Sequence, residues 1–160
     1  MQVCGILIKV PRVKKAGIPL RIYEDLSAFK LFFLGLGLLG ALSEAPADLM
    51  LVGNDAFTEF KGMFTEQFVL QQMVSMPDVF IYYWSSEHSD GELDFFIQKG
   101  ARIIPIEVKA EENVRAKSLR HFILANPSLK GLRFSMADYQ EQDWMTNIPL
   151  YAVSELARMQ

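Results

Sequence analysis

Residues 91–110 read GELDFFIQKGARIIPIEVKA. This stretch holds two runs rich in β-branched and aromatic residues, 92–99 and 101–110, which meet at Lys99-Gly100. Two such runs joined by a short turn with glycine are typical of an antiparallel hairpin. A third run, VFIYYW at 79–84, precedes them. Together the three runs predict a three-stranded antiparallel meander.

Helical and further strand patterns flank this meander. The segment 56–76 carries phenylalanines at positions 57, 60, 64 and 68, a 3–4 spacing that predicts a helix ending before Pro77. A second helix is expected near 115–125, followed by a strand at 131–137 and a strand leading into a short helix at 148–156. The resulting order, α-β-β-β-α-β, indicates an α/β (α+β) fold with a central mixed sheet flanked by helices.

The N-terminal part has a different character. Strand-like runs at 3–10 and 18–23 enclose the turn PRVKKAG, which predicts a basic β-hairpin extension. A strand at 29–34 and a short helix at 35–43 are expected to follow. We therefore divide the chain into an N-terminal segment, residues 1–43, and a main domain, residues 44–160.

Composition narrows the class of protein. The 160 residues are 51% apolar and 22% charged, which suits a packed globular domain and argues against disorder. A single cysteine, Cys4, excludes a thiolate zinc site, so any metal must be held mainly by carboxylates, which favours Mg²⁺ or Mn²⁺. The longest charge-free apolar run, 31–42, is shorter than the roughly 20 residues of a membrane span. We expect no membrane association and a cytoplasmic location.

Charge is distributed unevenly along the chain. The formal net charge is −3, yet the first 30 residues contain six Lys or Arg and only two acids. This asymmetry indicates a basic N-terminal arm beside an acidic body. An ordinary solvated hairpin tip would look the same.

Chemistry-bearing residues concentrate in the meander and the first main helix. Glu107 and Lys109 are two positions apart in a strand, so their side chains lie on one face. The hairpin turn sets Asp94 near residues 106–108 across the ladder. Glu66 lies at the edge of the apolar stripe of the first main helix, so it is expected to face the sheet or its rim.

Two carboxylates that share an apolar face repel each other unless a cation neutralises them. A divalent metal held there can position a water and stabilise charge on a phosphate. Plainer explanations stay open at this point. The pair Glu107–Lys109 is also consistent with a simple salt bridge, Asp94 with a strand-edge charge, and Glu66 with a solvated helix residue.

The pattern resembles the PD-(D/E)xK nuclease superfamily, which has a restriction-endonuclease-like αβββαβ core. The acid of the first core helix corresponds to Glu66, the second-strand aspartate to Asp94, and the (D/E)-x-K motif to Glu107-Val108-Lys109. The resemblance implies a Mg²⁺ (or Mn²⁺) ion bound by Asp94, Glu107, the backbone carbonyl of Val108 and Glu66. It also implies a catalytic role for Asp94, Glu107, Lys109 and Glu66.

A second resemblance covers nearly the whole chain. YEDLSAFKLFFLGLGLLGAL, FTEQFVLQQ and GELDFFIQKG, among other stretches, are similar to the C-terminal half of prokaryotic AAA-type ATPases that end in a nuclease-like domain of unknown function. This resemblance makes residues 1–23 the end of a winged-helix segment and implies an ATPase domain as partner. The chain contains no G-x-x-x-x-G-K-[ST] motif, so we expect no ATPase activity from it.

Two functions follow as alternatives. The first is a metal-dependent phosphodiesterase acting on DNA or RNA, and the second is a non-catalytic nucleic-acid-binding or assembly module of the ATPase. A homo-oligomer is kept open as well. Basic residues of the hairpin turn and of the 115–125 helix are the candidates for phosphate-backbone contacts. These are Lys14, Lys15, Arg115, Lys117 and Arg120.

Overall fold

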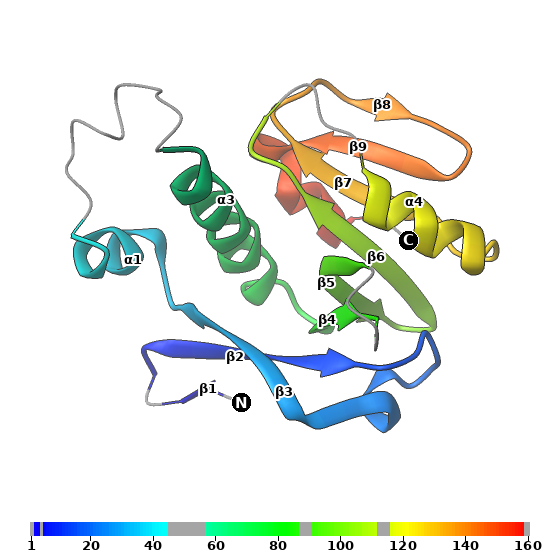
Figure 1. The fold of residues 1–160 in the computed structure, drawn as a ribbon, viewed down its shortest axis with the longest axis horizontal. Coiled ribbons are helices and arrows are strands. Elements are labelled where there is room, and N and C mark those ends of the chain that lie inside the picture. The colour runs from blue at the N-terminus through cyan, green and yellow to red at the C-terminus, as the bar shows by residue number, and fades with distance from the viewer. Residues whose placement is uncertain (1, 4, 45–56, 87–90, 112–115, 159–160) are drawn as a thin grey trace.

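The computed structural model describes residues 2–3, 5–44, 57–86, 91–111 and 116–158 (Figure 1). Its helices are α1 (Leu36–Leu42), α3 (Phe57–Val74) and α4 (Lys117–Ala125), and the 3₁₀ helices are η1 (Leu20–Tyr23) and η2 (Leu150–Ala157). Its strands are β1 (Gln2–Val3), β2 (Leu7–Val13), β3 (Glu24–Phe33), β4 (Val79–Ser85), β5 (Glu92–Lys99), β6 (Arg102–Val108), β7 (Gly131–Ser135), β8 (Gln140–Glu141) and β9 (Met145–Pro149).

The described strands form one mixed sheet. Its order is β1-β2-β4-β5-β6-β7-β9-β8, and β3 pairs with β2 outside this path. β4, β5 and β6 form the expected antiparallel meander, whereas β7 is parallel to both β6 and β9. The predicted α/β class and the αβββαβ order from α3 to β7 are therefore confirmed.

Each face of the sheet packs against its own helices. α3 and η2 cover one face, where Leu70 and Met73 of α3 belong to the same core as Phe95 and Ile97 of β5. α4 covers the opposite face, where Phe122 packs edge-on against Phe96. Figure 1 shows α3 and α4 on either side of the strands. Alternation along β5 sends successive aromatic side chains into the two cores.

Helix α3 confirms the helical spacing, but only part of the expected apolar stripe is fully buried. The phenylalanine spacing placed the core contact along Phe60, Phe64 and Phe68, and these side chains are only partly buried. The fully buried residues of α3 are Leu70, which continues the expected stripe, and Gln67, Val69 and Met73. The burial of α3 is therefore concentrated in its C-terminal half.

The N-terminal hairpin is confirmed, but one of its expected strands is wrong. Residues 20–23, expected as strand, form the 3₁₀ helix η1, and the partner of β2 is β3. Leu20 is fully buried and its N–H donates to the side-chain Oε1 of Gln98 at 2.8 Å. This anchor fixes a compact turn where the alternating pattern of IPLRIY suggested an extended chain. The boundary expected between residues 43 and 44 stays a prediction.

The C-terminal region begins its last long strand earlier than expected. β9 spans Met145–Pro149 and η2 follows at once, whereas the sequence suggested a strand starting at 148. The short strand β8 was not predicted. In the part of the chain that the structure describes, none of the helices has the length and apolar character needed to cross a membrane.

Candidate functional site

Asp94 lies at an irregularity in strand β5. Tyr82 pairs with Phe96 and Trp84 pairs with Leu93, so β5 has one more residue than β4 between these two pairs. Such a bulge breaks the strict alternation and re-aims a side chain. The carboxylate of Asp94 turns toward β6, where its Oδ2 accepts a hydrogen bond from the backbone N–H of Val108 at 2.6 Å.

Glu107 and Lys109 lie at the end of β6 and contact each other as the strand spacing predicted. The Nζ atom of Lys109 is 2.9 Å from Oε1 of Glu107. The Glu107 side chain is 5% exposed and that of Lys109 is 35% exposed, so the pair runs from the interior to the surface. The other carboxylate oxygen of Glu107, Oε2, is buried and has no hydrogen-bond partner in the described structure.

Glu66 projects from α3 toward the same group of charges. The pKa of its carboxyl is raised overall, mainly by burial. The positive charges of Lys30 and Lys109 lower this pKa, and the negative charge of Glu92 raises it. Burial, together with repulsion by Glu66, raises the pKa of Asp94 to about 7. Each of these two carboxyls disfavours the ionisation of the other, and a bound cation would relieve the repulsion.

Lys30 of β3 belongs to this site and was missed by sequence reasoning. Its ammonium group forms an ion pair with Glu92 and lies 5.1 Å from the centroid of the Tyr83 ring. Burial lowers the pKa of Lys30, but the hydrogen bond to Glu92 and the attraction of Glu66 outweigh burial and raise it overall. The only sequence signal was the basic charge of the first 30 residues, which indicates no position in space.

The donor set fits a hard divalent cation in part. Among the described residues, no three or more His, Cys, Asp and Glu side chains are arranged as a ready metal cage. Mg²⁺ does not require one, because it commonly binds one or two carboxylates and keeps several waters. The partnerless Oε2 of Glu107, the Asp94 carboxylate and the Val108 carbonyl are the groups of β5 and β6 suited to it.

The predicted phosphate-contacting residues lie on separate elements. Lys14 and Lys15 follow β2, with Nζ of Lys14 3.7 Å from Oδ2 of Asp25 and Nζ of Lys15 5.9 Å from the Tyr23 ring centroid. Lys117 and Arg120 are exposed on α4. Arg115 lies outside the described residues.

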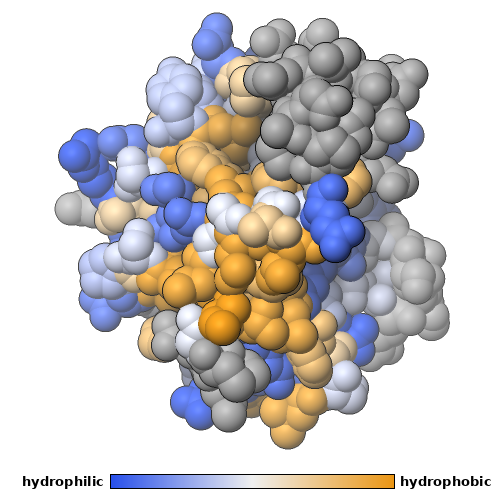
Figure 2. Space-filling view, turned by 90° about the vertical axis from the view of Figure 1, so that its left-hand side faces the viewer, coloured by the Kyte–Doolittle hydropathy of each residue, from blue (hydrophilic) through white to orange (hydrophobic). Residues whose placement is uncertain are grey.

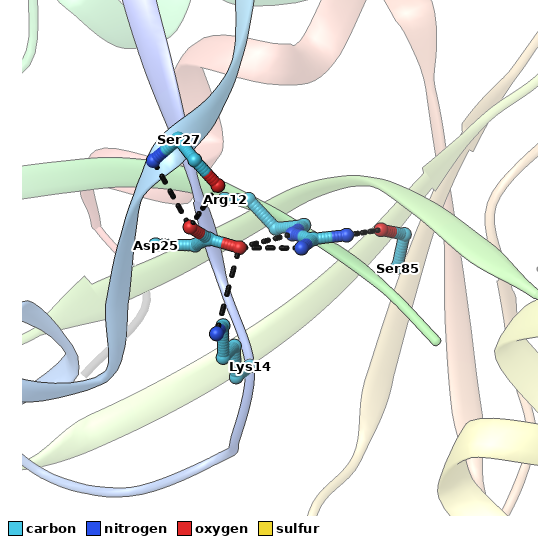
Figure 3. Close-up of polar contacts among 5 residues, drawn as sticks. All are labelled: Arg12, Lys14, Asp25, Ser27 and Ser85. Atoms are coloured by element: carbon cyan, nitrogen blue, oxygen red, sulfur yellow. Dashed lines mark hydrogen bonds and ion pairs between the residues drawn. The ribbon is translucent and has the colours of Figure 1, made fainter. Parts of the chain in front are cut away.

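Asp25 organises the hairpin around Lys14 (Figure 3). Hydrogen bonds donated by Ser27 and by Arg12 hold the pKa of the Asp25 carboxyl well below its usual value. Arg12 also donates from Nη1 to Oγ of Ser85, at the end of β4, at 3.4 Å. Lys14 is therefore held on the surface by a cluster that also fastens the hairpin to the rest of the sheet.

One groove lies away from these charges. It has a volume of about 1180 Å³ and opens beside the β5–β6 turn, where Arg102, Ile104 and Leu132 contribute to its lining. None of the predicted site residues that the structure describes lines it. The charged groups gather at the other end of β6, around Glu107 and Lys109, and this end is the candidate functional site.

The structure is that of an α/β protein with a cluster of carboxylates and lysines at one end of the central strands β5 and β6. A model of the family described as a domain of unknown function, DUF4143, matches residues 61–153, and the chain belongs to this family. No curated protein matches the chain. The matched region contains Glu66, Asp94, Glu107 and Lys109, whereas Lys30 and the N-terminal hairpin precede it.

Proposed function

We propose that this protein is a metal-dependent phosphodiesterase acting on nucleic acid. The observation that carries the proposal is the buried Oε2 of Glu107, which lacks a hydrogen-bond partner although its sister oxygen binds Lys109. A buried carboxylate oxygen without a partner is costly in a folded protein, and a bound cation would satisfy it. Asp94 adds a second carboxylate across the ladder, as the PD-(D/E)xK resemblance implies.

The residues divide into two groups by what they can do. Asp94 and Glu107, with the Val108 carbonyl and help from Glu66, would hold Mg²⁺ or Mn²⁺. When bound, such an ion supplies Lewis-acid stabilisation of the phosphate and makes a water more acidic. Asp94 must give up its proton to bind it, so its raised pKa makes binding sensitive to pH near neutrality.

Lys109 suits a role in orientation and charge stabilisation. Burial lowers the pKa of its amine, but the contact with Glu107 outweighs burial, so the net shift is upward. The amine therefore stays protonated at neutral pH and is a poor base for taking a proton from water. As a cation it would orient the attacking water and stabilise the negative charge that develops on the phosphate.

DNA or RNA is the proposed substrate class. Support comes from the exposed basic residues Lys117 and Arg120 on α4 and from the lysines that follow β2. The resemblance to AAA-type ATPases extends the proposal to a partner, an ATPase domain that this chain does not contain. Mg²⁺ or Mn²⁺ remains the proposed cofactor.

A non-catalytic assembly module is the second candidate. Figure 2 shows apolar side chains gathered on the side of the molecule where α1 lies. Leu34, just before α1, is 47% exposed, and Leu42, at the end of α1, is 60% exposed. Ile6, just before β2, is 52% exposed. A large exposed apolar patch is typical of a surface that binds another protein. The net charge of −3 also favours this candidate mildly over a nuclease.

Calorimetric titration with Mn²⁺ tests the first candidate. We expect saturable binding by the wild type and loss of binding in the Asp94→Ala/Glu107→Ala variant. Glu155→Ala, which removes an exposed carboxylate of η2, is the matched control and should bind as the wild type does. Cleavage of single- and double-stranded oligonucleotides follows in the same metal. A folded wild type that binds no Mn²⁺ and cleaves neither substrate would favour the assembly module.

A further inference from the structure

Lys30 lies outside the matched family region, yet it is close enough to Glu66 and Asp94 for their charges to act on it. It lies on β3, directly across the ladder from Val10 of β2. Val10 packs in the core on the α3 side of the sheet, and residues directly opposite in an antiparallel pair share a face. Lys30 therefore projects from the N-terminal hairpin toward the face where α3 carries Glu66.

Contacts on both sides hold the ammonium group in place. Its direct charged partner is Glu92, two residues before Asp94 in β5, and the face of Tyr83 lies 5.1 Å away. The negative charges of Glu66 and Asp94 also act on it. The Lys30 side chain is only 24% exposed, whereas that of Glu92 is 49% exposed. The cation is thus fixed at the edge of the site, and its partner carboxylate is about half exposed to solvent.

We propose that Lys30 is a phosphate-binding residue of this site, which Glu92 neutralises until a nucleic-acid phosphate replaces the carboxylate. The inference rests on the proposed nucleic-acid function and adds a residue from the N-terminal hairpin to the site. A lysine amine is a compact cation well suited to a phosphate oxygen. The half-exposed Glu92 carboxylate can return to water when a phosphate takes its place beside the Lys30 ammonium group.

The alternative role of metal ligand does not suit Lys30, because a protonated amine repels a divalent cation. Removal of Lys30 is therefore expected to affect nucleic-acid binding and to leave Mn²⁺ binding intact. These separate outcomes distinguish Lys30 from Asp94 and Glu107.

The experiment measures binding of a fluorescent single-stranded and a duplex oligonucleotide by anisotropy at several salt concentrations. Lys30→Gln should weaken binding about 5- to 20-fold and reduce the slope of log affinity against log salt by about one, as expected for one lost phosphate contact. Lys30→Arg should keep the wild-type slope. Glu92→Gln should bind more tightly than the wild type, because the competing carboxylate is gone.

Lys9→Gln is the matched control. Lys9 lies on the neighbouring strand of the same hairpin with its Nζ 4.6 Å from the Phe29 ring centroid, and in the described structure it has no ion pair. An equal loss of slope in Lys9→Gln and Lys30→Gln would overturn the inference, because general charge would then explain both. Unchanged binding by Lys30→Gln would overturn it while leaving the proposed function intact.

Mn²⁺ titration of the same variants separates the two proposals. Oligonucleotide binding that depends on Lys30, in a protein that binds no Mn²⁺, would support the inference and contradict the phosphodiesterase. A wild type that binds Mn²⁺ but no oligonucleotide would overturn the inference and leave the metal site standing.

Discussion

The side-chain amide of Gln67 pairs with both backbone groups of Phe33. Its Nε2 donates to the Phe33 carbonyl at 2.7 Å, and its Oε1 accepts from the Phe33 N–H at 3.0 Å. Gln67 is 1% exposed and follows Glu66 directly in α3. The amide thus replaces a strand neighbour at the end of β3 and fixes the hairpin that carries Lys30 against the helix that carries Glu66.

Gln67→Leu should destabilise the protein by about 1–3 kcal/mol, because two partly buried backbone groups would lose their partners. Urea unfolding followed by circular dichroism measures the change. Gln71→Leu is the control, since Gln71 lies one turn further along α3, is exposed, and accepts a single hydrogen bond from the Leu36 N–H. It should cost less than about 1 kcal/mol. Equal costs for the two variants would contradict the role given to Gln67.

The sequence predicted those parts of the site that depend on local periodicity. Two-residue alternation correctly placed Glu107 beside Lys109, because Lys109 directly follows β6 and its N–H still donates to the Phe134 carbonyl of β7. Alternation could not orient Asp94, because a bulge in β5 decides its direction. Lys30 was missed because its contact with Glu92 joins strands 62 positions apart along the chain, which no local pattern records.

The same distinction applies to the fold. The meander and both main helices follow from strong local patterns and were predicted. Residues 20–23 were assigned to a strand because an alternating run alone does not distinguish a strand from a short helix. The deciding contact is between the Leu20 N–H and Gln98, a residue of the meander.

Gly131 permits close packing of α4 on β7. A Cβ atom at this position would lie 2.8 Å and 2.9 Å from the two methyl carbons of the buried Leu119. Gly131→Ala should therefore destabilise the protein by about 1–3 kcal/mol through overpacking. Thermal unfolding is the measurement.

Gly62→Ala is the matched control for that substitution. Gly62 lies within α3, and a Cβ there would have no neighbour within 4 Å in the described structure. Alanine should stabilise the helix by about 0.5–1 kcal/mol. Opposite signs for the two substitutions are expected, and a stabilising Gly131→Ala would show that Leu119 has room to move.

Glu107 and Lys109 should be energetically coupled. Lys109→Met would leave the buried Glu107 carboxylate without its cation and should cost about 1–3 kcal/mol, since Lys109 is partly exposed to solvent. The double variant Glu107→Gln/Lys109→Met should be closer to the wild type in stability, because it removes both charges. A double-mutant cycle in urea measures the coupling energy. Purely additive effects would mean that the ion pair contributes nothing to stability.

Asp94 should make stability depend on pH between about 4 and 7. Its pKa is about 7 in the folded protein against 3.8 for an ordinary aspartate, mainly because of burial and then because of Glu66. Within this window the folded state keeps the proton that the unfolded state releases, so the free energy of unfolding falls as the pH rises. Below pH 4 both states are protonated, and above pH 7 the loss is complete.

Asp94→Asn removes this titration and keeps an oxygen that can accept from the Val108 N–H. Relative to the wild type, the variant should gain about 2–4 kcal/mol of stability between pH 4 and pH 8. Asp138→Asn, an exposed carboxyl, controls for the loss of one negative charge. Unfolding at pH 4, 6 and 8 measures the gain. A pH-independent difference between Asp94→Asn and the wild type would mean that the Asp94 carboxyl ionises as easily in the folded chain as in the unfolded one.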